Sequence, residues 1–103
     1  MKIEYKSNRL KRACTDLSVA KKDYGLNMAK LIHQRVNEIS SADSVEMLCQ
    51  FSIGKCHQLE GNRTGQYAMN LVQPYRLVFE RISIEEEGRN IEIVRILSIE
   101  DYH

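Results

Sequence analysis

The sequence predicts an α+β fold in which a mostly antiparallel sheet is covered on one face by an N-terminal helical hairpin. Two observations lead to this prediction. After a short alternating run at the N-terminus, apolar residues recur at helical spacings of three and four up to about residue 40. Beyond Phe51 the apolar period changes to two, which is typical of half-buried strands. The predicted element order is β-α-α-β-β-β.

The N-terminal half contains the first strand and both helices of the predicted hairpin. The run "MKIEYK" alternates apolar and charged residues and predicts a strand. One helical face over 8–24 is apolar, formed by Leu10, Ala13, Leu17, Ala20 and Tyr24. Gly25 fits the left-handed position after a helix end, and a second helix over 27–40 would pack antiparallel to the first. In "SADSVEML", Asp43 is the predicted N-cap of a short helical turn, with Glu46 three residues later.

The C-terminal half is predicted to form strands. Alternation over 67–71, the turn "QPY" and alternation over 76–80 indicate a hairpin. The charged stretch "EEEGRN" is interpreted as a loop, and the β-branched run "IEIVRILSI" (91–99) as the last strand, which Asp101 would follow.

Length and composition indicate one domain over 1–103 in a cytoplasmic protein. The chain has 103 residues, one proline and 43% apolar content, enough for one compact core. Its apolar runs are short and interrupted by charge, so none approaches the roughly 20 residues that a membrane span requires. We therefore expect no membrane association.

The net charge of +1 conceals an uneven distribution of charge along the chain. Residues 1–35 hold nine Lys/Arg and three acidic residues, whereas residues 36–103 hold six and eleven. The basic half could bind a polyanion such as RNA through Lys11, Arg12, Lys21 and Lys22. Alternatively, these four side chains merely keep a helix surface solvated.

The three cysteines are predicted to be buried, reduced thiols. Cys14, Cys49 and Cys56 are odd in number and lack CxxC spacing, which argues against a disulfide scaffold and a zinc site. Cys56 is next to His57, but adjacent residues on an extended chain point to opposite faces, so a buried cysteine is favoured over a nucleophile. A metal site formed by His57, Asp101 and His103 would have no recognised ligand spacing. No metal or cofactor is predicted.

Six residues at loops and strand ends form the candidate catalytic set: His57, Arg63, Arg76, Asp101, Tyr102 and His103. A rigid sheet can bring together side chains from such positions. Imidazoles, a carboxylate, a phenol and guanidiniums together suit proton transfer around a phosphate. Each residue also has a simpler interpretation: a histidine in a loop is commonly just a solvated polar side chain, and Arg76 could pair with Glu80 or Glu92.

The stretch "CHQLEGNRTGQYAMNLVQPYRLVFE" with the terminal "EDYH" closely resembles the HigB-type killer toxins of the RelE/ParE superfamily, which belong to bacterial type II toxin–antitoxin systems. The loop "H-x-L-x-G-x-R-x-G" and the final "DYH" are the specific parts. The resemblance spans nearly the whole chain and implies a RelE-like fold.

The resemblance also implies a function and its partners. It implies a ribosome-dependent endoribonuclease that cleaves mRNA and is inhibited by a cognate helix-turn-helix antitoxin of the HigA-like kind, with operator DNA bound only through the antitoxin. The functional residues implied are the six candidates named above. One departure is Glu60, where family members often have lysine. A carboxylate there would repel phosphate, so either cleavage is weaker or Lys55 supplies the positive charge instead.

Cleavage of RNA suits this residue set, because the RNA 2′-OH can act as the nucleophile without a metal or a covalent intermediate. His57 and His103 are the candidate acid and base, in either order, with Asp101 orienting one of them. Arg63 and Arg76 would bind the phosphorane, and Tyr102 would stack on a base or bind phosphate. Two other hypotheses keep the fold: a ParE-like gyrase poison, and a binding module that holds an antitoxin and tunes transcription.

Overall fold

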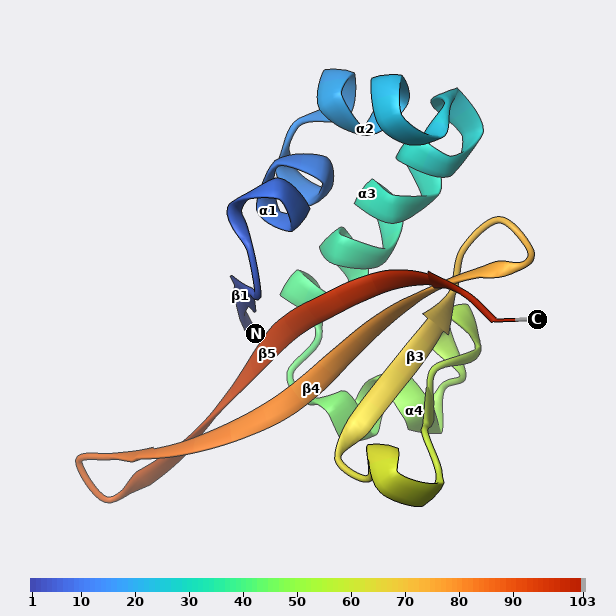
Figure 1. Ribbon diagram of the computed structural model, residues 1–103. Helices are drawn as coiled ribbons and strands as arrows, with labels where there is room; N and C mark the ends of the chain where they lie inside the picture. Colours follow the sequence, from blue (N-terminus) through green and yellow to red (C-terminus); the bar gives the residue numbers. More distant parts are fainter. Residues whose placement is uncertain (103) are drawn as a thin grey trace.

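The computed structural model describes residues 1–102 and shows a five-stranded sheet with helices packed against it (Figure 1). The strand order is β1-β5-β4-β3-β2. The α+β class predicted from the sequence is confirmed. The elements are β1 (Lys2–Tyr5), α1 (Asn8–Thr15), α2 (Leu17–Tyr24), α3 (Leu26–Ser41), α4 (Val45–Gln50), η1 (Ile53–Lys55), β2 (His57–Gln58), η2 (Gly61–Arg63), β3 (Gln66–Asn70), β4 (Tyr75–Glu86) and β5 (Arg89–Asp101).

The sheet is mostly antiparallel, as predicted, with one parallel pair. β1 lies parallel to β5, in a register that places Lys2 opposite Ile93, and the other neighbours are antiparallel. The sequence analysis missed β2, because a strand of two residues shows no alternation. This short strand matters because it brings His57 into the sheet.

The helical segment predicted over 8–24 is two helices, which corrects the predicted order. Asp16 ends α1 in an extended conformation, and its Oδ1 accepts hydrogen bonds from the Ser18 backbone N–H (3.0 Å) and the Ser18 hydroxyl (2.7 Å) at the start of α2. Such a cap competes with a continuous helix. Gly25 has a φ of +85°, as its predicted place after a helix end requires, and α3 follows directly.

The short helix α4 is present, but its cap differs from the prediction. Ser44, rather than Asp43, is the N-cap, and its hydroxyl accepts a hydrogen bond from the Met47 backbone N–H at 3.1 Å. Both residue types are good caps, so the sequence pattern alone did not distinguish them.

The hydrophobic core lies between the helices and one face of the sheet. Met28 and Ile32 of α3 belong to one buried cluster with Met69 of β3 and Phe79 of β4. The Phe79 ring stacks on that of Tyr67 with centroids 5.6 Å apart, so both rings are packing residues. The opposite face of the sheet carries a smaller apolar cluster around Leu59, Ala68 and Val78, together with polar side chains.

The stretch predicted as a charged loop is instead the tip of a long hairpin. β4 continues to Glu86 and β5 begins at Arg89, so only Glu87 and Gly88 turn the chain, both with positive φ (+51° and +76°) as in a type I′ turn. Figure 1 shows this ribbon projecting away from the body of the molecule. β5 also runs further than predicted, so that Asp101 is its last residue instead of following it.

Within residues 1–102, none of the helices combines the length and the apolar character that crossing a membrane would require.

Candidate functional site

The candidate site lies on the sheet face opposite the main core. Residues directly opposite one another on antiparallel strands share a face. The register places His57, Ala68, Val78 and Ser98 in one row across β2, β3, β4 and β5. In the next row, Arg76 on β4 is opposite Glu100 on β5. We call this surface the open face.

The loop after β2 folds onto the open face and carries Arg63 to it. The Leu59 backbone N–H donates to the Gln66 carbonyl at 2.8 Å, and the Leu59 side chain packs on Ala68 and Val78 in a small second apolar cluster. Arg63 follows in η2, where its Nε donates to Gln66 Oε1 at 2.9 Å. The apolar cluster therefore anchors the loop and aims a guanidinium across the strands.

Glu100 is the centre of the site. Arg63 binds it in a bidentate manner, with Nη1 to Oε1 at 2.9 Å and Nη2 to Oε2 at 2.7 Å. The Ser98 hydroxyl donates to Oε2 at 2.5 Å, and Arg76 Nη2 lies 3.6 Å from Oε1. Two cations from distant parts of the chain thus converge on one carboxylate.

These contacts determine the charge state of the site. The hydrogen bonds from Arg63 lower the pKa of Glu100 to about 2; the Ser98 hydrogen bond and the charges of both arginines act in the same direction, whereas burial opposes them. The same carboxylate raises the pKa of Arg63. Glu100 and Arg63 are therefore both ionised at neutral pH.

Tyr102 completes the cluster through Arg76. The Arg76 guanidinium carbon lies 4.7 Å from the centroid of the Tyr102 ring, in a cation–π contact. The Tyr102 hydroxyl donates to Gln73 Oε1 at 3.2 Å, and its backbone N–H donates to the Pro74 carbonyl at 3.3 Å. Arg76 Nε is buried and has no hydrogen-bond partner among residues 1–102. Among residues 1–102, Arg76 therefore meets Glu100 through Nη2 and Tyr102 through the face of its guanidinium.

His57 shares the open face but lies at its edge. Neighbouring strands are spaced about 4.8 Å apart, so three intervals place His57 roughly 14 Å from the Ser98 position on β5. The imidazole is exposed, and its Nδ1 lies 2.9 Å from the Lys55 carbonyl oxygen. Lys55 and Glu60 are both exposed in the same stretch of chain. A ligand spanning several strands could contact His57 and the arginines together.

The remaining two candidates are placed differently. Asp101 pairs with Tyr75 in the ladder, and strand alternation puts its side chain on the face opposite Glu100. His103 lies outside the described residues. The structure therefore groups Arg63, Arg76 and Tyr102, places His57 at the edge of the same face, and separates Asp101 from them.

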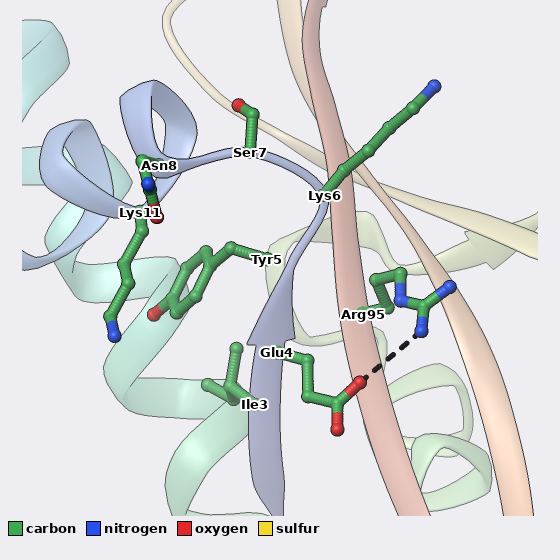
Figure 2. Close-up of a pocket in the computed structure, with 8 residues that line it drawn as sticks. All are labelled: Ile3, Glu4, Tyr5, Lys6, Ser7, Asn8, Lys11 and Arg95. Carbon is green, nitrogen blue, oxygen red and sulfur yellow. Dashed lines mark hydrogen bonds and ion pairs between the residues drawn. The ribbon is translucent and has the colours of Figure 1, made fainter.

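The predicted RNA-binding lysines and arginines are exposed but divided among different surfaces. Lys11 lines a hollow of about 530 Å³ between β1, α1 and β5, and Figure 2 shows its side chain pointing away from that of Lys6. Arg95 in this hollow is paired with Glu4 at 3.4 Å. Arg12 and Lys22 line a separate hollow of about 440 Å³, and Lys21 is exposed on α2.

Sequence reasoning missed Glu100, Ser98 and Gln66. The expected partners of Arg76 were also wrong: Glu80 pairs with Arg95 and Glu92 with Arg81, whereas Arg76 pairs with Glu100. The two-residue spacing of Ser98 and Glu100 places both on one face of a strand, which is a usable signal. Their pairing with Arg76 depends on the β4–β5 register, which the sequence does not show.

Within residues 1–102, no three His, Cys, Asp or Glu side chains are arranged to hold a metal ion. Two guanidiniums can bind an anionic oxygen, a phenol can stack or donate, and an imidazole at the edge can transfer a proton.

Comparison with protein-family models and with curated proteins finds no match. Among solved structures, the chain is similar to the YoeB/ParE toxin from Agrobacterium tumefaciens, with a TM-score of 0.64 and 13% sequence identity over 100% of both chains. At this identity the likeness shows a shared fold.

Proposed function

We propose that this protein is the toxin of a type II toxin–antitoxin system and that it cleaves mRNA on the ribosome as a HigB-like endoribonuclease of the RelE/ParE superfamily. The observation that carries the proposal is the convergence of Arg63 and Arg76 on one anionic group beside the Tyr102 ring. The fold shared with a YoeB/ParE toxin and the "H-x-L-x-G-x-R-x-G" and "DYH" motifs support it.

In this proposal the RNA phosphate binds Arg63 and Arg76 in place of Glu100, which binds them in the free protein. Bidentate contact suits a phosphate as well as a carboxylate. With a pKa of about 2, Glu100 is a poor base at neutral pH, so its role is to keep both guanidiniums in place before RNA binds.

Proton transfer is assigned to His57 and His103. One of them removes the proton from the 2′-OH and the other protonates the leaving 5′-oxygen, so the reaction needs no metal ion or other cofactor. Tyr102 stacks on a base next to the scissile phosphate, and Asp101 orients the terminal histidine. Lys55, near His57, contributes positive charge in place of Glu60.

The proposed partners follow from this role. Lys11, Arg12, Lys21 and Lys22 contact ribosomal RNA through phosphates, which position the protein without reading sequence. A HigA-like helix-turn-helix antitoxin holds the toxin inactive and connects it to operator DNA. The protein works in the cytoplasm, where the ribosomes are.

A second candidate function is favoured by Glu100 itself and by Glu60. A carboxylate that neutralises both arginines, together with a second acidic residue near His57, weakens attraction for phosphate. These features suit a toxin-fold binding module that holds an antitoxin and tunes transcription. The ParE-like alternative would instead inhibit DNA gyrase.

The test is cleavage by purified protein added to translating ribosomes, with new mRNA 5′ ends mapped. Wild type should produce new ends, and Arg63→Ala should not. Arg89→Ala, which removes an exposed arginine at the ribbon tip, is the matched control and should cleave normally. Absence of new ends with wild type, accompanied by inhibited gyrase supercoiling, would support the ParE-like role. Absence of both activities would leave the binding module.

A further inference from the structure

Cys49 and Cys56 lie close together in a way that the proposed cleavage reaction does not use. Cys49 is in α4, Cys56 directly precedes β2, and their Sγ atoms are 3.5 Å apart. Both are free thiols, and the third cysteine, Cys14, is buried in α1. Cys56 is directly followed by His57 in the sequence.

The fold imposes this proximity through a tight chain reversal over 51–55. Ser52, Gly54 and Lys55 all have positive φ. The Ser52 backbone N–H donates to the Cys49 carbonyl at 3.1 Å, and the Lys55 backbone N–H donates to the Ser52 carbonyl at 3.0 Å. Glycine adopts this conformation readily, but for Ser52 and Lys55 it is costly and persists only where the surroundings hold it.

Arg35 of α3 holds the reversal from outside. A Cβ added at Gly54 would lie 2.7 Å from Arg35 Nε, so the guanidinium packs directly on that glycine. The same Nε donates to the Asn70 carbonyl at 2.7 Å, and Nη1 pairs with Glu38 at 2.8 Å. The two sulfur atoms therefore face one another on a constrained backbone.

The sulfur pair is accessible from one side. Cys49, Cys56 and His57 line a hollow of about 400 Å³ together with Glu46 and Arg81. Cys49 is half-buried, whereas Cys56 is 6% exposed. Burial, and secondarily the contact with the Cys49 thiol, raise the pKa of Cys56. Cys49 is thus the sulfur that a small reagent in the hollow reaches first.

We propose that Cys49 and Cys56 form an oxidation site at which hydrogen peroxide converts the two thiols to an intramolecular disulfide. The Cys49 thiolate attacks the peroxide; the O–O bond breaks, a sulfenic acid forms, and hydroxide leaves to become water. Cys56 sulfur then attacks Cys49 sulfur, the S–O bond breaks, the S–S bond forms, and a second water leaves. Two thiols are oxidised and one peroxide is reduced.

The disulfide would change the position of the segment that carries His57. Its imidazole Nδ1 lies 2.9 Å from the Lys55 carbonyl oxygen, and Cys56 is the residue between them. Drawing Cys56 sulfur to bonding distance of Cys49 pulls this segment towards α4. This coupling to cleavage rests on the proposed function, whereas formation of the cross-link does not.

The cross-link is tested by peptide mapping of the full chain after titration with hydrogen peroxide and alkylation of the remaining thiols. Trypsin cleaves after Lys55 and so separates the two cysteines into peptides 36–55 and 56–63. We expect these peptides to be joined under non-reducing conditions, with the loss of two hydrogens, in a protein of unchanged size. Over-oxidised Cys49 beside an alkylated Cys56, or cross-linked dimers, would overturn the proposal.

Two variants make the result specific. Cys14→Ser should cross-link as wild type does. In Cys49→Ser, Cys56 should remain alkylatable at peroxide levels that cross-link wild type, and oxidation of Cys56 at the wild-type rate would contradict the assigned order. Circular dichroism checks that both variants are folded. Peptide mapping of the wild-type protein tests the cross-link independently of either variant.

The effect on His57 has its own readout. The His57 ring resonances, measured by NMR, should shift when the disulfide forms and return when it is reduced. Unchanged His57 resonances in cross-linked protein would overturn the coupling. An intact cross-link in a protein that never cleaves mRNA would count against the proposed function alone.

Discussion

Both ends of the β4–β5 hairpin are antiparallel strand pairs, but they differ in neighbouring strands, burial and charge. At the arginine end, β4 lies between β3 and β5, and Leu77, Phe79 and Ile96 are fully buried. Towards the ribbon end, pairing with β3 reaches no further than Glu80 and pairing with β1 no further than Ile93. Beyond these residues β4 and β5 pair only with each other. Ile84 and Ile91 pair across the ribbon yet remain 40% and 36% exposed.

The two ends also differ in how their charged side chains are arranged. At the arginine end, opposite charges face each other across strands and from the Arg63 loop, in contact with a buried apolar layer. At the ribbon end, Glu85, Glu86 and Glu87 follow one another and are exposed. The difference teaches that tertiary neighbours, rather than strand formation, convert charged residues into an organised site.

The largest expected effect is on the stability of the arginine end. Phe79→Ala should lower the free energy of unfolding by about 3–5 kcal/mol, because it removes a fully buried ring and leaves a cavity beside Tyr67. Ile84→Ala should cost less than about 1 kcal/mol, since that side chain is already largely solvated. Urea unfolding measures both. Equal losses would show that the ribbon is part of the core.

The next effect concerns cleavage. Arg63→Ala should lower the mRNA cleavage rate by about 10²–10³, the typical loss on removing one preorganised group that stabilises transition-state charge. Arg63→Lys should recover little of the loss, because an ammonium cannot reproduce the bidentate geometry seen with Glu100. Quantitative primer extension on translating ribosomes gives the rates. Full activity in both variants would remove Arg63 from the site.

A smaller effect is expected in the pH dependence of stability. The pKa of Glu100 falls from an ordinary 4.5 to about 2 on folding, so its contribution is present above pH 4.5 and is lost as the pH falls towards 2. We expect this contribution to be about 1 kcal/mol, because solvent reaches the side chain and screens its charge.

Glu100→Gln should remove that acid-dependent loss, while Glu86→Gln at the ribbon end should keep it. Urea unfolding at pH 5.5 and pH 3 compares the three proteins. An unchanged difference in Glu100→Gln would mean that another carboxyl group is responsible.

The smallest effect should be a gain at the ribbon tip. Glu87 has a φ of +51° in the two-residue turn before Gly88, a position that asparagine occupies more readily. Glu87→Asn should stabilise the protein by about 0.5 kcal/mol. Glu85→Asn, which lies within the strand, should give no gain in the thermal midpoint. A loss of stability in Glu87→Asn would argue against the turn.

Much of the fold was predictable because the spacing of apolar residues in a segment matches the helix or strand that the segment forms. The helical period over 27–40 and the alternation over 67–71 and 76–80 correspond to α3, β3 and β4. The break at Asp16 was missed because the apolar period continues across it. The ribbon was missed because a run of charged residues is typical of a loop, although pairing with β5 keeps it extended.

The candidate site was predictable only in part. Arg63, Arg76 and Tyr102 were identified from the motifs, and the structure brings them together. Glu100 was overlooked because a glutamate in a strand has no distinctive signal by itself. Its importance comes from Arg63, 37 residues away along the chain.

Three properties can be read from the sequence: the elements whose apolar period is regular, the basic character of the N-terminal half, and the kinds of side chain available for chemistry. Which of those side chains come into contact depends on the packing of distant segments. The register of β4 against β5 and the anchoring of the Arg63 loop by Leu59 determine the contacts of Glu100. The reason is physical: periodicity reports which face a residue occupies, whereas an ion pair depends on distances of a few ångströms between segments far apart in sequence.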